Sequence, residues 1–180
     1  MTTDLLPRSV PRSAPALPVK DVAIVCLIVF FTTVALTLEL YWLLHHQEME
    51  SRTDLFARII SLYWPLDHSW RIPGYPIEKA LNLSLEGVNA LVTPILSAIL
   101  LWAIVKHRRY RYPLQLFIGT YTCYGTFLYF GVAHLSGYVI IAQKGVGNFL
   151  LFYLANMPWL AGYAWMAWDA YRAIVRGERG

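Results

Sequence analysis

The segment that decides the fold of this chain is VAIVCLIVFFTTVALTLELYWLL, residues 22–44, in which Glu39 is the one charged side chain. A helix of about 20 apolar residues crosses the roughly 30 Å hydrocarbon core of a bilayer. The segment is therefore predicted to be a transmembrane helix. It is too long for the apolar region of a signal peptide, and no small-residue cleavage site follows it, so we expect it to remain as an anchor.

Three further apolar runs of sufficient length lie at about residues 80–105, 114–142 and 147–175. The chain is 57% hydrophobic and 14% charged, whereas a soluble domain carries about 25% charged residues. We therefore expect an all-α membrane protein, a four-transmembrane-helix bundle that forms one domain over residues 21–175. Residues 1–20 contain four prolines and are predicted to be a disordered cytoplasmic tail, and residues 176–180 a short second tail.

Residues 48–79 form the one long connection between the predicted spans. Within it, residues 53–63 have the apolar spacing of a short amphipathic helix, and the turn-rich, aromatic stretch after them suits a lid at the headgroup boundary. Ten of the fifteen Lys and Arg residues lie in or next to the two tails and the loop after residue 105. By the positive-inside rule, both termini are expected in the cytoplasm and the lid on the opposite side.

The composition also argues against several kinds of function. The two cysteines, Cys26 and Cys123, lie inside apolar segments and indicate neither a disulfide framework nor a metal site, and we expect no cofactor. The net charge of +4 comes from basic residues that flank the spans, which argues against a nucleic-acid partner. The expected partners are membrane lipid and a lipophilic small molecule. The sequence leaves open whether the protein is a monomer or a homodimer.

Two carboxylates, Glu39 and Glu86, lie inside the first and second predicted spans, and no Lys or Arg lies within the span cores. An ionisable group in hydrocarbon is costly and normally faces a cavity or a partner. Further polar and aromatic residues recur at spacings of three and four, which places those of each helix on one face. These stripes predict an intramembrane polar cavity. Its expected substrate-binding residues are Asn89, Thr122, Thr126, Tyr129, Asn156, Trp159 and Tyr163.

The polar residues of the spans also have a purely structural interpretation. Thr, Ser and Gln side chains commonly hydrogen-bond between membrane helices, and for these residues that interpretation is preferred. For Glu39 and Glu86 a catalytic role is favoured, because two carboxyls buried without cations leave one protonated acid and one ionised base at neutral pH. Trp159 could offer a π-face to a developing cation, although ordinary packing explains this aromatic residue equally well.

Several short motifs follow one another in a defined order along the chain. They are LELYW at 38–42, LE at 85–86 followed by Pro94, YPLQL at 112–116, YGTFLYF at 124–130 and FYLANMPW at 152–159. In this order, over roughly residues 22–175, the chain resembles the emopamil-binding proteins, the sterol Δ8-Δ7 isomerases of the EXPERA family. The sigma-two receptor, a four-helix member of that family, has acids at similar places.

This resemblance implies both a mechanism and a location. It implies acid-base roles for Glu39 and Glu86, and it implies that Asn156 and Trp159 line the cavity and steady a carbocation. It also implies an integral protein of the endoplasmic reticulum, or of the inner membrane if the source is bacterial.

Two positions depart from the isomerases, which have a histidine in place of Ala35 and an aspartate in place of Thr126. Three functions therefore stay open. The first is a membrane-embedded isomerase that acts through a carbocation-like state on a sterol, terpenoid or polyketide. The second is an epoxide-opening hydrolase or cyclase of natural-product biosynthesis. The third is a non-catalytic sterol or lipid binder of the sigma-two type, in which an acid pairs with a ligand amine.

Overall fold

The computed structural model describes residues 17–71, 76–141 and 145–178, and these residues form helices and turns with no strand among them. The helices of the bundle are α1 (Val19–Val34), η1 (Ala35–Glu39), α2 (Leu40–His45), α4 (Pro76–Leu91), α5 (Thr93–Val105), α6 (Arg111–Leu135) and α7 (Val146–Val175). Between α2 and α4 lie two short helices, α3 (Leu55–Ser61) and η2 (His68–Trp70). Most of the predicted tail 1–20 lies outside the described residues.

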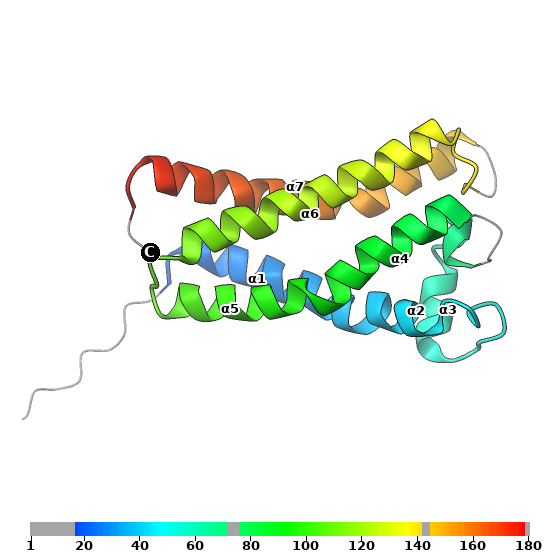
Figure 1. The fold of residues 1–180 in the computed structure, drawn as a ribbon, viewed down its shortest axis with the longest axis horizontal. Helices are drawn as coiled ribbons and strands as arrows, with labels where there is room; N and C mark the ends of the chain where they lie inside the picture. The colour runs from blue at the N-terminus through cyan, green and yellow to red at the C-terminus, as the bar shows by residue number, and fades with distance from the viewer. Residues whose placement is uncertain (1–16, 72–75, 142–144, 179–180) are drawn as a thin grey trace, which may run out of the picture.

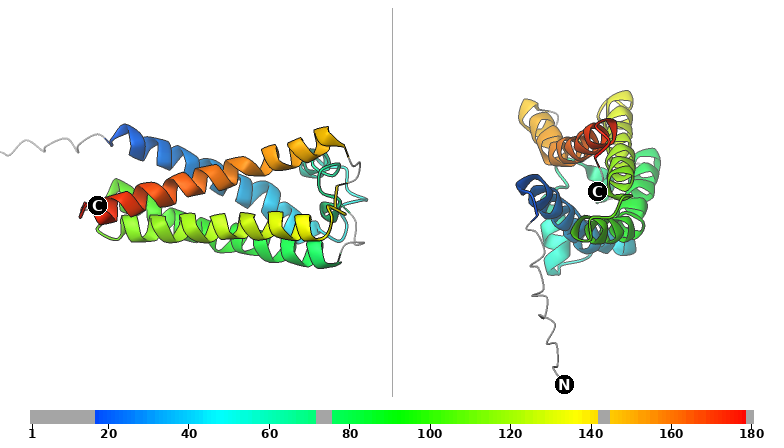
Figure 2. Two further views of the ribbon diagram at one scale, coloured as in Figure 1. Left: turned by 90° about the horizontal axis from the view of Figure 1, so that it is seen from above. Right: turned by 90° about the vertical axis from the view of Figure 1, so that its left-hand side faces the viewer.

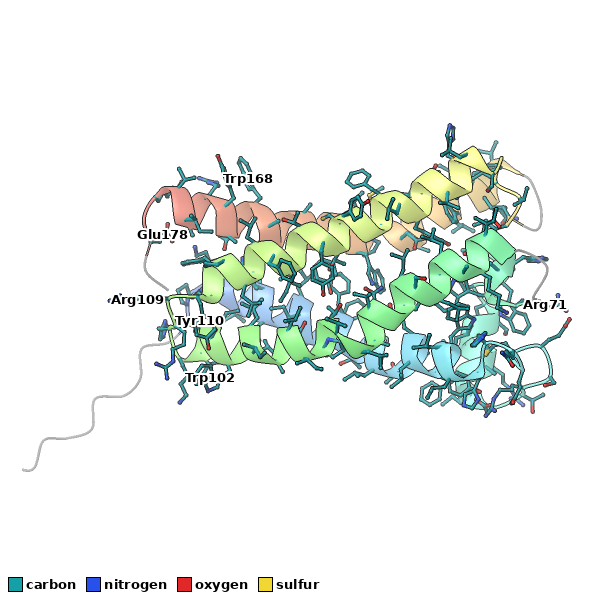
Figure 3. All side chains as sticks on the ribbon, in the orientation of Figure 1. Arg71, Trp102, Arg109, Tyr110, Trp168 and Glu178 are labelled. Atoms are coloured by element: carbon teal, nitrogen blue, oxygen red, sulfur yellow. The ribbon has the colours of Figure 1, made fainter. Side chains whose placement is uncertain are left out.

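The long helices run side by side along one axis (Figure 1). α6 pairs with α7 along its length, while α1 and α2 lie beside α5 and α4 in the other half of the bundle. The start of α1, the turn between α5 and α6 and the end of α7 lie at one end, and α3 lies at the other (Figure 2). Figure 3 shows Trp102, Arg109 and Tyr110 at the first end and Arg71 at the second.

Three helical stretches among the described residues are long and apolar enough to cross a membrane, namely Val19–His45, Ile77–Val105 and Arg111–Leu135. Many large apolar side chains on these helices, such as Phe30, Ile95 and Phe127, are exposed on the outside of the bundle, as expected where lipid is the solvent. The protein is therefore an all-helical integral membrane protein. α7 has 30 residues and is long enough to span, but it is not one of the three, so the fourth span remains a prediction.

Two irregularities interrupt the spans away from their ends. Ala35–Glu39 forms a π-helical turn, in which the Thr37 hydroxyl donates to the backbone carbonyl of Thr33 at 2.6 Å. The wider turn rotates the residues after it relative to those before it, and Glu39 is only 6% exposed. In the second span, Pro94 lacks a backbone N–H, so the helix is divided just before it into α4 and α5. Both irregularities lie within a few turns of Glu39, which is buried, or Glu86, which is half-buried.

A buried ion pair holds the end of the bundle where the described chain begins and ends. Arg111 Nη1 donates to Asp21 Oδ2 at 3.0 Å, Nη2 donates to Oδ1, and both side chains are 3% exposed. Gln115 Nε2 donates to the backbone carbonyl of Met166 at 2.9 Å and to Asp169 Oδ2 at 3.2 Å. These contacts fix α1, α6 and α7 to one another.

The third apolar helix is shorter than predicted. α6 ends at Leu135, whereas the apolar run had suggested a span of 114–142. Gly137 and Tyr138 adopt φ values of 68° and 55°, in the left-handed region that terminates helices. The Tyr138 amide donates to the carbonyl of Ala133 at 2.8 Å, which satisfies an otherwise free carbonyl of the last turn.

The segment predicted as a lid, residues 48–79, contains the expected short helix. Asp54 caps α3, because its Oδ1 accepts a hydrogen bond from the Ala57 amide at 3.3 Å. α4 begins at Pro76, inside the predicted lid, so the second helix extends further than the apolar run indicated.

Candidate functional site

A cavity of about 420 Å³ lies inside the bundle, bounded by η1, α4, α6, α7 and the segment that precedes α4. Eight of the nine predicted site residues line it: Glu39, Glu86, Asn89, Thr122, Thr126, Tyr129, Asn156 and Trp159. The ninth, Tyr163, is not among the lining residues. It follows Trp159 by about one turn of α7, where its ring stacks on Phe31 with the centroids 4.7 Å apart and is 4% exposed.

Glu39 and Glu86 both line this cavity, Glu39 from η1 and Glu86 from α4. Asn89 lies one turn after Glu86 and donates its Nδ2 to Glu86 Oε2 at 3.1 Å. Glu39 Oε2 is buried and has no hydrogen-bond partner among the described residues. The two acids therefore differ: Glu86 accepts a hydrogen bond that suits a carboxylate, while Glu39 keeps an oxygen for a proton or a ligand.

The cavity wall offers these acids no counter-charge. Among the described residues that line it there is no Lys, Arg or His, and much of the remaining wall is apolar, including Leu38, Ile60 and Leu85. Two neighbouring carboxylates are costly to ionise together without a cation in such surroundings. The pair is thus suited to hold one proton, with one acid protonated and the other ionised.

Trp159 lines the same cavity as the two acids, and other aromatic rings pack against it. Its ring packs on Phe31 with the centroids 4.8 Å apart. Phe31 in turn stacks on Tyr163, and neither of these two rings lines the cavity. This arrangement presents a supported aromatic group in the cavity that Glu39 and Glu86 also line.

Two threonines of α6 complete the wall opposite α4. The Thr126 hydroxyl donates to the backbone carbonyl of Thr122 at 3.2 Å, so its proton is used within the helix. Thr122 Oγ1 is buried and has no hydrogen-bond partner in the described part of the chain. Thr122 therefore has the hydroxyl that is available to a ligand.

Three polar residues at this end of the cavity were not predicted as site residues: Tyr63 and Asp67 lie in the segment before α4, and Asn82 lies in α4. Tyr63 and Asn82 line the cavity. Asp67 is 0% exposed and accepts hydrogen bonds from Ser69, Asn82 and Tyr129. Burial raises the pKa of the Asp67 carboxyl above its ordinary value, and these hydrogen bonds act in the opposite direction.

One of these residues had a detectable signal in the sequence. Asn82 lies one helical turn before Glu86, so the polar stripe of α4 could have been extended to it. Asp67 lies in an irregular, turn-rich stretch, where no periodic pattern indicates which side chains point inward.

A comparison with known families identifies the family of the chain. The family model of the EXPERA domain, the EXPanded EBP superfamily, matches residues 68–170, from η2 to near the end of α7. The matched region includes Glu86 and all of α6, while Glu39 precedes it. No curated protein sequence matches the chain. Because the family model covers more than half of the residues, the chain belongs to the EXPERA family.

Proposed function

We propose that the protein is a membrane-embedded isomerase that uses carboxyl acid-base catalysis on a lipophilic sterol, terpenoid or polyketide substrate. The observation that carries the proposal is that two carboxyls, Glu39 and Glu86, line one cavity inside the bundle and that the described lining of this cavity has no cationic side chain. Such pairs provide an acid and a base at the same pH. Membership of the EXPERA family supports a function of this kind.

The hydrogen bonds suggest which acid plays which part. Glu86 accepts from Asn89 and is assigned as the ionised base, whereas Glu39, with its unpartnered Oε2, is assigned as the protonated acid. Glu39 transfers its proton to one carbon of an alkene, and the electron deficiency falls on the other carbon. Glu86 then removes a proton from a carbon next to that cation, so the double bond moves and the substrate keeps its composition.

The surroundings of the acids fit an oily substrate with a transient positive charge. Val88, Tyr124 and Leu128 line the cavity and are also 41%, 63% and 37% exposed, so the cavity wall is accessible from the lipid-facing side. The indole of Trp159 and the ionised acid would both stabilise a cation, an effect that desolvation strengthens.

A second candidate function follows from the same observation. An acidic, cation-free cavity suits a ligand that brings its own positive charge, so a sterol or lipid binder that pairs an acid with a ligand amine remains an alternative. An epoxide-opening hydrolase or cyclase would use Glu39 to protonate the epoxide oxygen and Glu86 to activate water or an internal hydroxyl.

Deuterium labelling separates these functions in one experiment. Protein in lipid nanodiscs is incubated in D₂O with a Δ8 sterol, a terpenoid alkene and a terpenoid epoxide, and the products are analysed by mass spectrometry. Isomerisation predicts a product that gains one deuterium and loses one hydrogen, because the acid delivers D⁺ and the base removes H⁺. Hydrolysis predicts the addition of one D₂O. Unchanged substrates, together with saturable binding of a lipophilic amine, would replace the enzymatic proposal with the binder.

The topology belongs to the same proposal. We infer that α7 is the fourth span, that both termini face the cytoplasm and that the protein resides in the endoplasmic reticulum. The basic residues around the turn from α5 to α6, among them Arg109 at the end opposite Arg71 (Figure 3), support this orientation.

A further inference from the structure

A chain of hydrogen bonds leads from the segment before α4 into the cavity wall. Asn156 Nδ2 of α7 donates to the Tyr63 hydroxyl at 2.9 Å. The hydroxyls of Tyr63 and Tyr129 are 2.9 Å apart, and the Tyr129 hydroxyl donates to Asp67 Oδ2 at 2.6 Å. Four residues that are far apart in the sequence are thereby connected in series.

The two ends of this chain determine the direction of every bond in it. Asp67 Oδ1 accepts from the backbone amide and the hydroxyl of Ser69 at 2.8 and 2.6 Å, and Oδ2 accepts from Asn82 Nδ2 at 3.1 Å as well as from Tyr129. Four donors occupy the four acceptor positions of a carboxylate. The Tyr129 hydroxyl therefore donates its proton to Asp67, and the Tyr63 hydroxyl donates its proton to Tyr129.

The other end of the chain is an amide whose orientation is also determined. Asn156 Nδ2 donates to the backbone carbonyl of Phe152 at 2.8 Å and to Tyr63. A carbonyl oxygen can only accept, so the NH₂ group must face Phe152, and both of its hydrogens are then in use. The carbonyl oxygen Oδ1 is the polar atom that Asn156 retains for the cavity.

We propose that Asp67 is a positioning residue that acts through Tyr129 and Tyr63 to hold Asn156 with its carbonyl oxygen towards the ligand. The presence of a ligand rests on the proposed function, whereas the arrangement of hydrogen bonds itself does not require turnover. Two consequences follow. Tyr63 and Tyr129 line the cavity but have no free proton to give, so they are not the catalytic acids. The Asn156 carbonyl oxygen instead accepts a hydrogen bond from a ligand hydroxyl or stabilises a developing positive charge.

The polypeptide contains four asparagines, which makes a direct test practical. They are Asn82, Asn89, Asn148 and Asn156. Protein labelled with ¹⁵N-asparagine in detergent or nanodiscs gives a few side-chain amide signals, and the pair that disappears in Asn156→Asp is assigned to Asn156. Its proton shifts and its exchange rate with water are then measured in variants of the chain of hydrogen bonds. No substrate is needed, so failure of this test and failure of the proposed reaction are distinguishable.

The informative variants are Asp67→Asn, Tyr129→Phe and the matched control Ser69→Ala. Asp67→Asn and Tyr129→Phe should shift the Asn156 amide signals and accelerate their exchange about fivefold or more, the ratio expected for one ordinary hydrogen bond. Ser69→Ala removes the bond from the Ser69 hydroxyl to Asp67 Oδ1 and the bond that this hydroxyl accepts from Asn82. It keeps the bond from Tyr129 to Asp67 Oδ2 and should leave Asn156 unchanged. If Asp67→Asn does not fold, Tyr129→Phe decides alone. Asn156 signals that stay unchanged in Tyr129→Phe, or that move equally in Ser69→Ala, would overturn the proposal.

Discussion

Glu39 of η1 and Glu86 of α4 come from two different helices and line the same cavity inside the bundle. The π-helical turn that ends at Glu39 adds to the inward rotation of this side chain, and Asn89 orients the Glu86 carboxyl from one turn away. A π-turn is rare within helices and is frequent at functional sites. Trp159 lines the same cavity, and the first two predictions concern these three residues.

Replacing either acid by glutamine should abolish most of the turnover. Glu39→Gln and Glu86→Gln keep the shape of the side chain but remove its ability to transfer a proton, so kcat on a confirmed substrate should fall about 10²-fold or more. Substrate affinity, measured by binding, should change much less. Glu48→Gln is the control, because Glu48 is exposed and lies outside the cavity lining. Full activity in both Gln variants would end the acid-base assignment.

Trp159 should show a graded effect. Trp159→Phe retains a weaker π-face on the Phe31 support and should lower kcat mildly, whereas Trp159→Ala should approach the Gln variants if a cation forms beside the indole. The measurement is kcat and KM for the two variants in parallel. Equal, small losses in both variants would mean that the indole only packs.

The sequence predicted the parts of the fold that depend on long apolar runs and helical periodicity. Those two signals located three of the four predicted spans, and eight of the nine predicted site residues line one cavity. Tyr163 does not line that cavity, because spacing identifies a helix face but not the depth at which a cavity ends along it. Its ring stacks on Phe31 instead.

The segment before α4 was less predictable for a physical reason. Its conformation depends on tertiary hydrogen bonds such as those of Asp67 to Ser69, Asn82 and Tyr129, and these join residues that no local pattern relates. The end of α6 was similarly hidden, because the apolar residues continue past the left-handed turn at Gly137. Hydropathy indicates which residues are apolar enough to contact lipid, but it does not indicate the residue at which a helix ends.

The topology can be tested by labelling single cysteines with a membrane-impermeant thiol reagent in a variant that lacks Cys26 and Cys123. In sealed vesicles of endoplasmic reticulum, whose outer face is the cytoplasmic face, Arg109→Cys and Arg176→Cys should react without permeabilisation, because both residues are exposed at the end of the bundle where the described chain terminates. Ser51→Cys, exposed near α3, should react only after the vesicles are permeabilised. Labelling of Arg176→Cys on the same side as Ser51→Cys would show that α7 does not cross the membrane.

The close contact of α6 with α7 should be sensitive to a single methyl group. A Cβ added at Gly119 would lie 2.7 Å from the Tyr163 carbonyl oxygen and 2.9 Å from the Ala167 Cβ, so the helices would have to separate. Gly119→Ala should therefore lower the unfolding free energy by about 1–3 kcal/mol, the usual cost of overpacking. Gly131→Ala is the control on the same helix, because nothing lies within 4 Å of its added Cβ. Equal Tm values for the two variants in detergent would contradict the close approach.

Replacing one member of the buried ion pair of Asp21 and Arg111 should lower the unfolding free energy more than replacing both members. Both side chains are 3% exposed, so Asp21→Leu or Arg111→Met alone leaves an uncompensated buried charge, and each should destabilise the protein by about 3–5 kcal/mol. The double variant Asp21→Leu with Arg111→Met leaves no such charge and should be more stable than either single variant.

A matched surface pair provides the comparison for this experiment. Lys20 lies next to Asp21 in sequence and pairs with Asp169 at 3.4 Å, but its side chain is 42% exposed. Lys20→Met should therefore change the unfolding free energy by no more than about 1 kcal/mol. The measurement is Tm and the urea midpoint in detergent for all the variants. If the double variant lost as much unfolding free energy as the two single variants together, Asp21 and Arg111 would not interact energetically. An uncompensated buried charge would then not explain the destabilisation of the single variants.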